Sequence, residues 1–322
     1  MNFLVTSSPH IRASVTTRSL MRDVIFALIP ALVMGIVFQG VRALVVTVVS
    51  VATCLIAEFL YGKIVYKKNT VKDASAAVTG FLLAMILPAN VSLGAVVLGA
   101  VFAIIVVKAL SGGLGNNIFN PALAGRAILM LLVPAQIIRF AAPGTALPLF
   151  GTADIISAAT PLHEMRMPII PKVPVMDLII GRAAGCIGEV SALMLILGGI
   201  YLIVRKVISW HIPVAYLGTV AVLALVFSKT DAPLMWMVYN LVSGGVMLGA
   251  FFMATDYATS PTSNKGKLIY GIGCGILTYV FRNVGLYPES VTYSILLMNA
   301  LSWAIDRFTA PRVFGKEKGG RA

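Results

Sequence analysis

The chain has 322 residues, of which 59% are hydrophobic and only 11% are charged, against roughly 25% charged residues in an ordinary soluble domain. This composition, with a mean hydropathy of +0.94, excludes a soluble enzyme and a disordered chain. The formal net charge is +13, but the basic residues gather in short loops and form no binding face, so we expect no nucleic-acid partner.

Ten apolar, charge-poor runs predict transmembrane helices, because a spanning helix needs about 20 mostly apolar residues. Backbone amides in lipid must be paired within their own segment, which favours helices over strands. The runs cover residues 23–39, 43–62, 74–88, 93–110, 122–140, 184–204, 211–228, 233–254, 266–284 and 289–306. The third run is the shortest, and it shares a charge-free stretch with the fourth that is long enough for two passes. The sequence therefore predicts an all-α polytopic membrane protein.

The distribution of Lys and Arg predicts how these helices are oriented. With a cytoplasmic N-terminus, 16 of the 25 basic residues lie on the cytoplasmic side and 7 on the opposite side. We therefore expect residues 1–22 and the tail 309–322 in the cytoplasm. The long segment 141–183 becomes an extracytoplasmic loop, and membrane lipid surrounds the helices.

The ten helices are arranged as two sets of five, residues 23–140 and residues 184–308. Because five is odd, the second set would be inverted relative to the first. The two sets echo each other weakly, for example at residues 79–83 and 248–252. Inverted repeats place binding sites near the bilayer midplane, often beside broken helices. Chance agreement of spacing in a ten-helix protein is the plainer alternative.

Glycines and asparagines interrupt the apolar sequence just before the fifth helix. They are Gly112, Gly113, Gly115, Asn116, Asn117 and Asn120, followed by Pro121. Asparagine in lipid needs polar partners, so this segment is either a non-helical site for an ion, a polar ligand or a partner subunit, or a plain turn before a helix. Arg126 either contacts an anionic ligand or reaches the headgroups. Lys108 and Glu58 lie near helix ends and are expected at the membrane interface.

Residues that commonly carry catalysis or bind metal form no recognised pattern. The histidines are scattered and give no metal-ligand spacing, so we predict no metal site. Cys54, Cys186 and Cys274 lie in apolar runs, where buried free cysteines are expected. Phosphate-binding glycine fingerprints and a serine nucleophile motif are also lacking. No catalytic residue is predicted from local motifs.

The extracytoplasmic loop carries the most informative motif. Asp154, Ser157, Ala159 and Thr160 fall in the pattern Asp-Ile-Ile-Ser-Ala-Ala-Thr, followed by Pro-Leu. This pattern resembles the flavinylation motif of the D subunit of the Rnf complex and of the related B subunit of the sodium-translocating NADH:quinone oxidoreductase. In that family the last threonine is esterified to the phosphate of FMN, and Thr160 is the matching residue. The resemblance implies that Asp154, Ser157 and Ala159 are recognised by a separate flavin transferase. Ala158 stands where the family often has glycine.

Two other segments strengthen this resemblance, residues 111–122 and residues 253–261. The resemblance implies a urea-transporter-like fold in the inner membrane of a bacterium or archaeon. It implies an electron-transfer subunit of a complex that passes electrons between ferredoxin and NAD and moves Na⁺ or H⁺. The other Rnf subunits would be its partners, and the chain alone would not be a complete enzyme.

A second, non-covalent flavin, such as riboflavin, could lie by the helix breaks. The candidate residues are Gly112, Gly113, Asn116, Asn117, Asn120, Arg126 and Asp256, which could equally line an ion path. For Asp256 the alternative is an interfacial carboxylate beside Lys265 and Lys267.

Two other functions are consistent with the same residues. A secondary transporter or channel for a small polar solute would also use inverted repeats and broken helices. A structural anchor for partner subunits would need neither flavin nor ion path. Fold alone does not decide between these functions.

Overall fold

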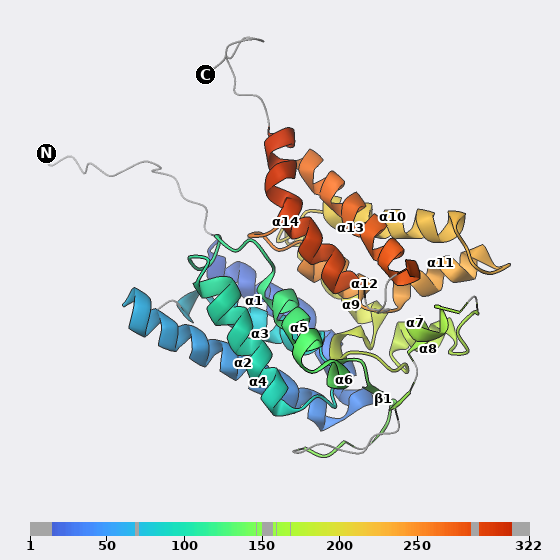
Figure 1. The fold of residues 1–322 in the computed structure, drawn as a ribbon, viewed down its shortest axis with the longest axis horizontal. Coiled ribbons are helices and arrows are strands. Elements are labelled where there is room, and N and C mark those ends of the chain that lie inside the picture. Colours follow the sequence, from blue (N-terminus) through green and yellow to red (C-terminus); the bar gives the residue numbers. More distant parts are fainter. Residues whose placement is uncertain are drawn as a thin grey trace, which may run out of the picture.

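A computed structural model shows a mostly helical chain in which two groups of helices lie side by side (Figure 1). The structure describes residues 15–67, 71–145, 147–149, 157–158, 160–167, 169–284 and 290–310, except the side chains of residues 66, 157 and 158. Most of the predicted loop motif lies outside these residues. Asp154 and Ala159 are not described, and Ser157 is described by its backbone only.

The first group contains α1 (Thr17–Gln39), α2 (Val41–Tyr61), η1 (Gly62–Tyr66), η2 (Val71–Asp73), α3 (Ser75–Met85), α4 (Leu93–Val101), η3 (Phe102–Ala109), α5 (Pro121–Leu132) and α6 (Pro134–Ile137). The connecting segment contains β1 (Phe140–Ala141), β2 (Ser157–Ala158), α7 (Pro161–Glu164), α8 (Val175–Ile180) and η4 (Ile187–Glu189). The second group contains α9 (Ala192–Val204), α10 (His211–Val226), α11 (Pro233–Val242), α12 (Val246–Leu248), η5 (Gly249–Met253), α13 (Asn264–Val284) and α14 (Val291–Thr309). The segments η1, η3 and η5 are π-helical, and η2 and η4 are 3₁₀ helices.

The two groups meet through the first and the last long helices of each group. In the first group α2 packs on α3 and α4, and in the second group α10 packs on α11 and α13. Across the boundary α1 packs on α9, and α5 packs on α14. Fully buried Leu28, Leu83 and Tyr270 contribute to the core that both groups share. Large apolar side chains such as Phe26 and Val222 are exposed on the outside, as expected for helices that face lipid tails.

The lengths of the helices support a membrane protein. The number of times the chain crosses the membrane stays a prediction. Each of the ten predicted ranges contains a helix. Among the described residues, two helical stretches, Thr17–Gln39 and Val41–Val65, are long and apolar enough to cross a membrane alone. A third is Pro233–Val242 with Val246–Met253, if this pair, bent by 61°, is one broken span. The ten spans, the inverted repeat and the urea-transporter-like fold stay predictions.

Two predicted helices are shorter than expected. The apolar run 184–204 contains α9, but this helix begins only at Ala192, after the 3₁₀ segment η4. The apolar run 122–140 contains α5, but this helix ends at Leu132 and Phe140 already belongs to β1. The interruption falls at Pro134, because proline has no N–H for the helix ladder and its ring clashes with the preceding turn. The start of α5 follows its sequence closely: Asn120 Oδ1 accepts hydrogen bonds from Ala122 N (3.0 Å) and Leu123 N (3.4 Å).

The prediction for the cysteines is confirmed. Cys54, Cys186 and Cys274 are all free and buried. Cys54 and Cys274 belong to the core that both groups share, where a free cysteine acts as a small apolar side chain, and Cys186 lies just before η4.

Candidate functional site

Thr160 lies at the start of α7, where it caps the helix. Its Oγ1 accepts a hydrogen bond from His163 N (3.3 Å), and its side chain is partly exposed. The Pro-Leu pair that follows it has a structural role. Leu162 is buried, together with Met165, in a small hydrophobic cluster that includes Trp236. The residues next to Thr160 therefore anchor it against the second group of helices.

Thr160 lines a pocket of about 370 Å³, counted to its open mouth. We call it the threonine pocket. One wall comes from the segment before α9 and includes Gly185 and Glu189. The other wall comes from the end of α11 and includes Ser243 and Gly244. The two walls meet at the Glu189 carboxylate, whose Oε1 would lie 2.5 Å from a Cβ atom on Gly245.

The second wall is the break between α11 and α12. Gly244 and Gly245 have φ angles of +66° and +69°, a conformation that favours glycine. Arg282, buried near the end of α13, holds the break together. Its guanidinium donates hydrogen bonds to the carbonyl oxygens of Asn240 (2.5 Å), Ser243 (2.6 Å) and Gly244 (3.2 Å). These carbonyls end a helix and lack partners within it, so Arg282 acts as a C-terminal cap.

Little of the remaining loop motif is described. The backbone of Ser157 pairs with Ala141, which makes β2 antiparallel to β1. Asp154 and Ala159 lie outside the described residues. The recognition roles of these three residues stay predictions.

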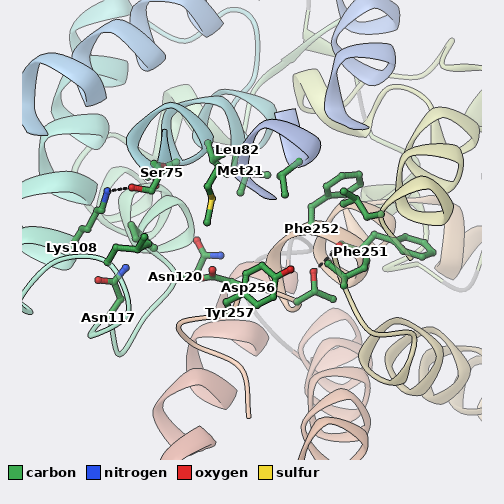
Figure 2. A pocket seen from close by; sticks show the side chains of 18 residues that line it. Met21, Ser75, Leu82, Lys108, Asn117, Asn120, Phe251, Phe252, Asp256 and Tyr257 are labelled. Carbon is green, nitrogen blue, oxygen red and sulfur yellow. Dashed lines mark hydrogen bonds between the residues drawn. The ribbon is translucent and has the colours of Figure 1, made fainter. Parts of the chain in front are cut away.

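A second pocket lies where the two groups of helices meet (Figure 2). We call it the central pocket. Its volume is about 670 Å³, counted to its mouth, within the range of small-molecule pockets. The π-helical segments of both groups reach it, η3 with Lys108 and η5 with Phe251 and Phe252. Such segments are frequent at functional sites.

Three of the predicted residues meet in the central pocket, namely Asn117, Asn120 and Asp256. Asn120 joins the two groups, since its Nδ2 donates a hydrogen bond to the carbonyl oxygen of Met253 (3.3 Å). Asn117 is buried, and its Oδ1 has no hydrogen-bond partner among the described residues. A buried acceptor of this kind is rare without a ligand or water.

Lys108 and Glu58 form a buried ion pair, so the two side chains point into the protein and Lys108 does not reach out to the headgroups. Lys108 Nζ lies 2.7 Å from Glu58 Oε1 and 2.5 Å from Ser75 Oγ. The two charged side chains are 3% and 9% exposed. A charge in the bundle interior needs a partner, and each of these two side chains supplies it for the other.

Asp256 follows η5 and lines the central pocket. Burial raises the pKa of its carboxyl group, while N–H groups of Ala258 and Tyr257, the Thr259 hydroxyl and the charge of Lys108 oppose this shift. Thr259 Oγ1 donates a hydrogen bond to Asp256 Oδ2 (3.3 Å). Asp256 therefore lines the pocket with a carboxyl group whose charged form is disfavoured by burial.

The other predicted residues lie elsewhere. Gly112 and Gly113 have φ angles of +104° and +91° and belong, with Asn116, to the turn after η3, outside the lining of the central pocket. Arg126 is buried and donates a hydrogen bond to Cys186 Sγ (3.5 Å). It therefore neither reaches the headgroups nor lines the central pocket.

Sequence reasoning missed the residues that complete both pockets. Ser243, Gly244 and Glu189 line the threonine pocket, and Lys108 lines the central one. The paired glycines at 244 and 245 within an apolar run were the available signal for the broken helix. Within the described residues, no group of three or more His, Cys, Asp or Glu could hold a metal ion.

Comparison with known proteins places the chain. Residues 4–315 match the model of the NQR2, RnfD, RnfE family. The chain belongs to this family. It is 47% identical over 322 residues to the D subunit of the Na(+)-translocating ferredoxin:NAD(+) oxidoreductase complex of Acetobacterium woodii, covering 99% of this chain and 97% of the relative.

Two further relatives match over nearly their whole length. The D subunit of the proton-translocating ferredoxin:NAD(+) oxidoreductase complex of Clostridium ljungdahlii is 39% identical, with 98% of this chain and 97% of the relative covered. The D subunit of the ion-translocating oxidoreductase complex of Halorhodospira halophila is 36% identical, with 98% and 96% covered. The family resemblance inferred from the motifs is confirmed.

Proposed function

We propose that this chain is the membrane electron-transfer subunit of a ferredoxin:NAD oxidoreductase complex that translocates Na⁺ or H⁺. Membership of the family and the names of relatives that match over their full length support this role. Its partners would be the other subunits of that complex, in the cytoplasmic membrane with both termini inside. The packing of α1 on α9 and of α5 on α14 supports two related five-helix units.

Covalent FMN on Thr160 is the central part of this proposal. The observation that carries it is that Thr160, the residue matching the attachment motif, is partly exposed on a pocket and anchored there through Leu162. A partly exposed hydroxyl can be reached by a flavin transferase. A phosphate ester would then tie the cofactor permanently to one loop. The flavin accepts one or two electrons, and the protein positions it.

The central pocket fits a second, non-covalent flavin such as riboflavin. The aromatic rings of Phe251, Phe252 and Tyr257 line it beside the amides of Asn117 and Asn120. The Asn117 Oδ1 atom without a partner suits a flavin N–H, and an apolar pocket with a few polar groups is typical of ligand sites.

The experiment compares Thr160→Ala with the native chain in the whole complex. After denaturing electrophoresis of the native complex, ultraviolet light should show a fluorescent band for this subunit, and Thr160→Ala should abolish it. Electron flow from ferredoxin to NAD should stop in the same variant. A fluorescent band retained in Thr160→Ala would contradict attachment at this residue. Fluorescence absent from the native subunit would favour the transporter alternative, and normal electron flow in Thr160→Ala would favour a structural anchor.

A further inference from the structure

The segment that follows Thr160 lies along α11 (Figure 1). We call residues 160–167 and 169–181 the flanking segment. Its helix α8 packs on α11. Leu178 of α8 is buried in one cluster with Trp236, which lies near the start of α11. Leu162 reaches Gly244, just after the end of α11. The flanking segment therefore follows α11 along most of its length.

The position of α11 sets the depth of its neighbours in the membrane. With the bent continuation Val246–Met253, this helix is long and apolar enough to cross a membrane as one broken span. With both termini in the cytoplasm, α11 is the outer half of that span. A segment that packs along α11 therefore lies at the depth of the outer leaflet. The sequence had predicted it as part of a loop outside the membrane.

The side chains that the flanking segment turns away from the protein are large and apolar. They are Met167, Ile169, Ile170, Met176 and Ile180, of which Met167 is 62% and Met176 63% exposed. The neighbouring α11 exposes Leu234 and Met235. A run of exposed apolar side chains in water is rare without a partner, whereas beside a membrane helix it is the surface expected to face lipid tails.

The exposed charges of this region are basic, which favours lipid as the partner. Arg166, Lys172 and Arg182 are exposed, whereas the carboxylates of Glu164 and Asp177 are half-buried. Basic side chains beside an apolar face are typical of segments that lie in the membrane interface. Their long stems can follow apolar surface while their charged ends reach the phosphates of the headgroups.

The backbone of the flanking segment is also suited to this place. Irregular backbone at membrane depth is tolerated only where the protein pairs its polar groups. Pro171 and Pro174 have no N–H group that would need a partner. The carbonyl oxygen of Val173 accepts a hydrogen bond from the Tyr239 hydroxyl of α11 (2.7 Å). The contact with α11 thus supplies a polar partner that lipid tails lack.

We propose that the flanking segment lies in the outer leaflet and forms part of the lipid-facing surface of the protein. Its exposed apolar side chains contact acyl chains, and its exposed basic side chains contact the phosphates of the headgroups. The chain after Thr160 thus returns into the membrane before α9 begins. This inference rests on the proposed place of the chain in a membrane and is independent of the flavin.

The test introduces the photocrosslinking residue p-benzoylphenylalanine at Met176 in the whole complex. The native membrane is irradiated, and the mass of this subunit is measured. Val222 of α10, 58% exposed, is the reference for a side chain that faces lipid. Exposed Lys72 of η2 is the reference for water. Met176 should give the mass of one added phospholipid as often as Val222, and Lys72 should not give it.

Ile169, 52% exposed on the same segment, is a second probe if the Met176 variant does not assemble. Crosslinks from Met176 or Ile169 to another subunit would overturn the proposal, because a protein would then cover this surface. A lipid yield as low as that of Lys72 would overturn it too, because the segment would then lie in water. The mass of peptide 140–166 from the same material reports separately whether FMN is attached, so either failure leaves the attachment at Thr160 untouched.

Discussion

Leu162 packs against Gly244 so closely that a Cβ atom on Gly244 would lie 2.6 Å from Leu162 Cδ2. This contact joins the loop that carries Thr160 to the break between α11 and α12. The position of the proposed flavin therefore depends on a glycine far away in the sequence. It also explains why a Pro-Leu pair follows Thr160, since Leu162 is buried in the cluster behind it.

Gly244→Ala should displace the attachment loop. Alanine would adopt an unfavourable φ of +66° and would collide with Leu162, which together should cost about 1–3 kcal/mol. We expect a lower Tm and less FMN on peptide 140–166. Gly218→Ala is the matched control, because a Cβ atom there meets nothing within 4 Å. An equal effect of both substitutions would contradict a specific role for the Leu162 contact.

The buried pair of Lys108 and Glu58 should behave differently from a surface pair. Lys108→Met leaves the Glu58 carboxylate buried without its partner and should cost about 3–5 kcal/mol. The double variant Glu58→Gln, Lys108→Met should recover most of this loss. Arg205→Met breaks the pair with Asp23, in which the arginine side chain is 57% exposed, and should cost about 0–1 kcal/mol.

The difference in stability between these variants is measured by thermal unfolding of the purified complex, with the fluorescence of this subunit as the signal. If Lys108→Met were no more destabilising than Arg205→Met, the pair would not be buried as described.

Substitutions of Asn117 and Asn120 should have different effects, because Asn117 is proposed to bind a ligand and Asn120 caps a helix. Asn120→Ala removes the cap of α5 and the bond to Met253 O, and should cost about 0.5–2 kcal/mol. Asn117→Ala removes an acceptor that has no described partner, so stability should be retained. We expect Asn117→Ala to lose the non-covalent flavin, measured as flavin released by acid per complex. Native flavin content in Asn117→Ala would count against riboflavin in the central pocket.

The stability of the chain should depend on pH through Asp256. Burial raises the pKa of Asp256 in the folded chain, so between the unfolded value of about 3.9 and the folded value, the folded state binds more protons. Stability from this group therefore falls as pH rises through that window. Asp256→Asn should raise the Tm more at pH 8 than at pH 5. Asp231→Asn, at an exposed position, should show no such difference, and a gain independent of pH in Asp256→Asn would refute the effect.

Hydropathy was enough to locate the helices, because each range of apolar residues contains one. The start of α5 also followed from local chemistry, since Asn120 and Pro121 form a standard cap. The burial of Lys108 could not be predicted, because a lysine near a helix end can reach either the headgroups or the interior. Only its position beside Glu58, far away in the sequence, decides this.

The residues that form the wall of the threonine pocket could not be predicted from the sequence, for a similar reason. Ser243 and Gly244 lie in another helix group than the motif, and their approach to Thr160 depends on the packing of Leu162. The motif itself predicted the attachment residue through its resemblance to a family and not through local physics. A threonine in a loop would otherwise suggest only a turn or a cap.

The most direct test of the account is the mass of tryptic peptide 140–166 from the native complex. It contains Thr160 with no internal Lys or Arg before its C-terminal residue. We predict that the peptide is heavier by one FMN less one water, and that fragmentation places the added mass on Thr160. An unmodified peptide, or FMN on Thr145, Thr152 or Ser157, would contradict the account.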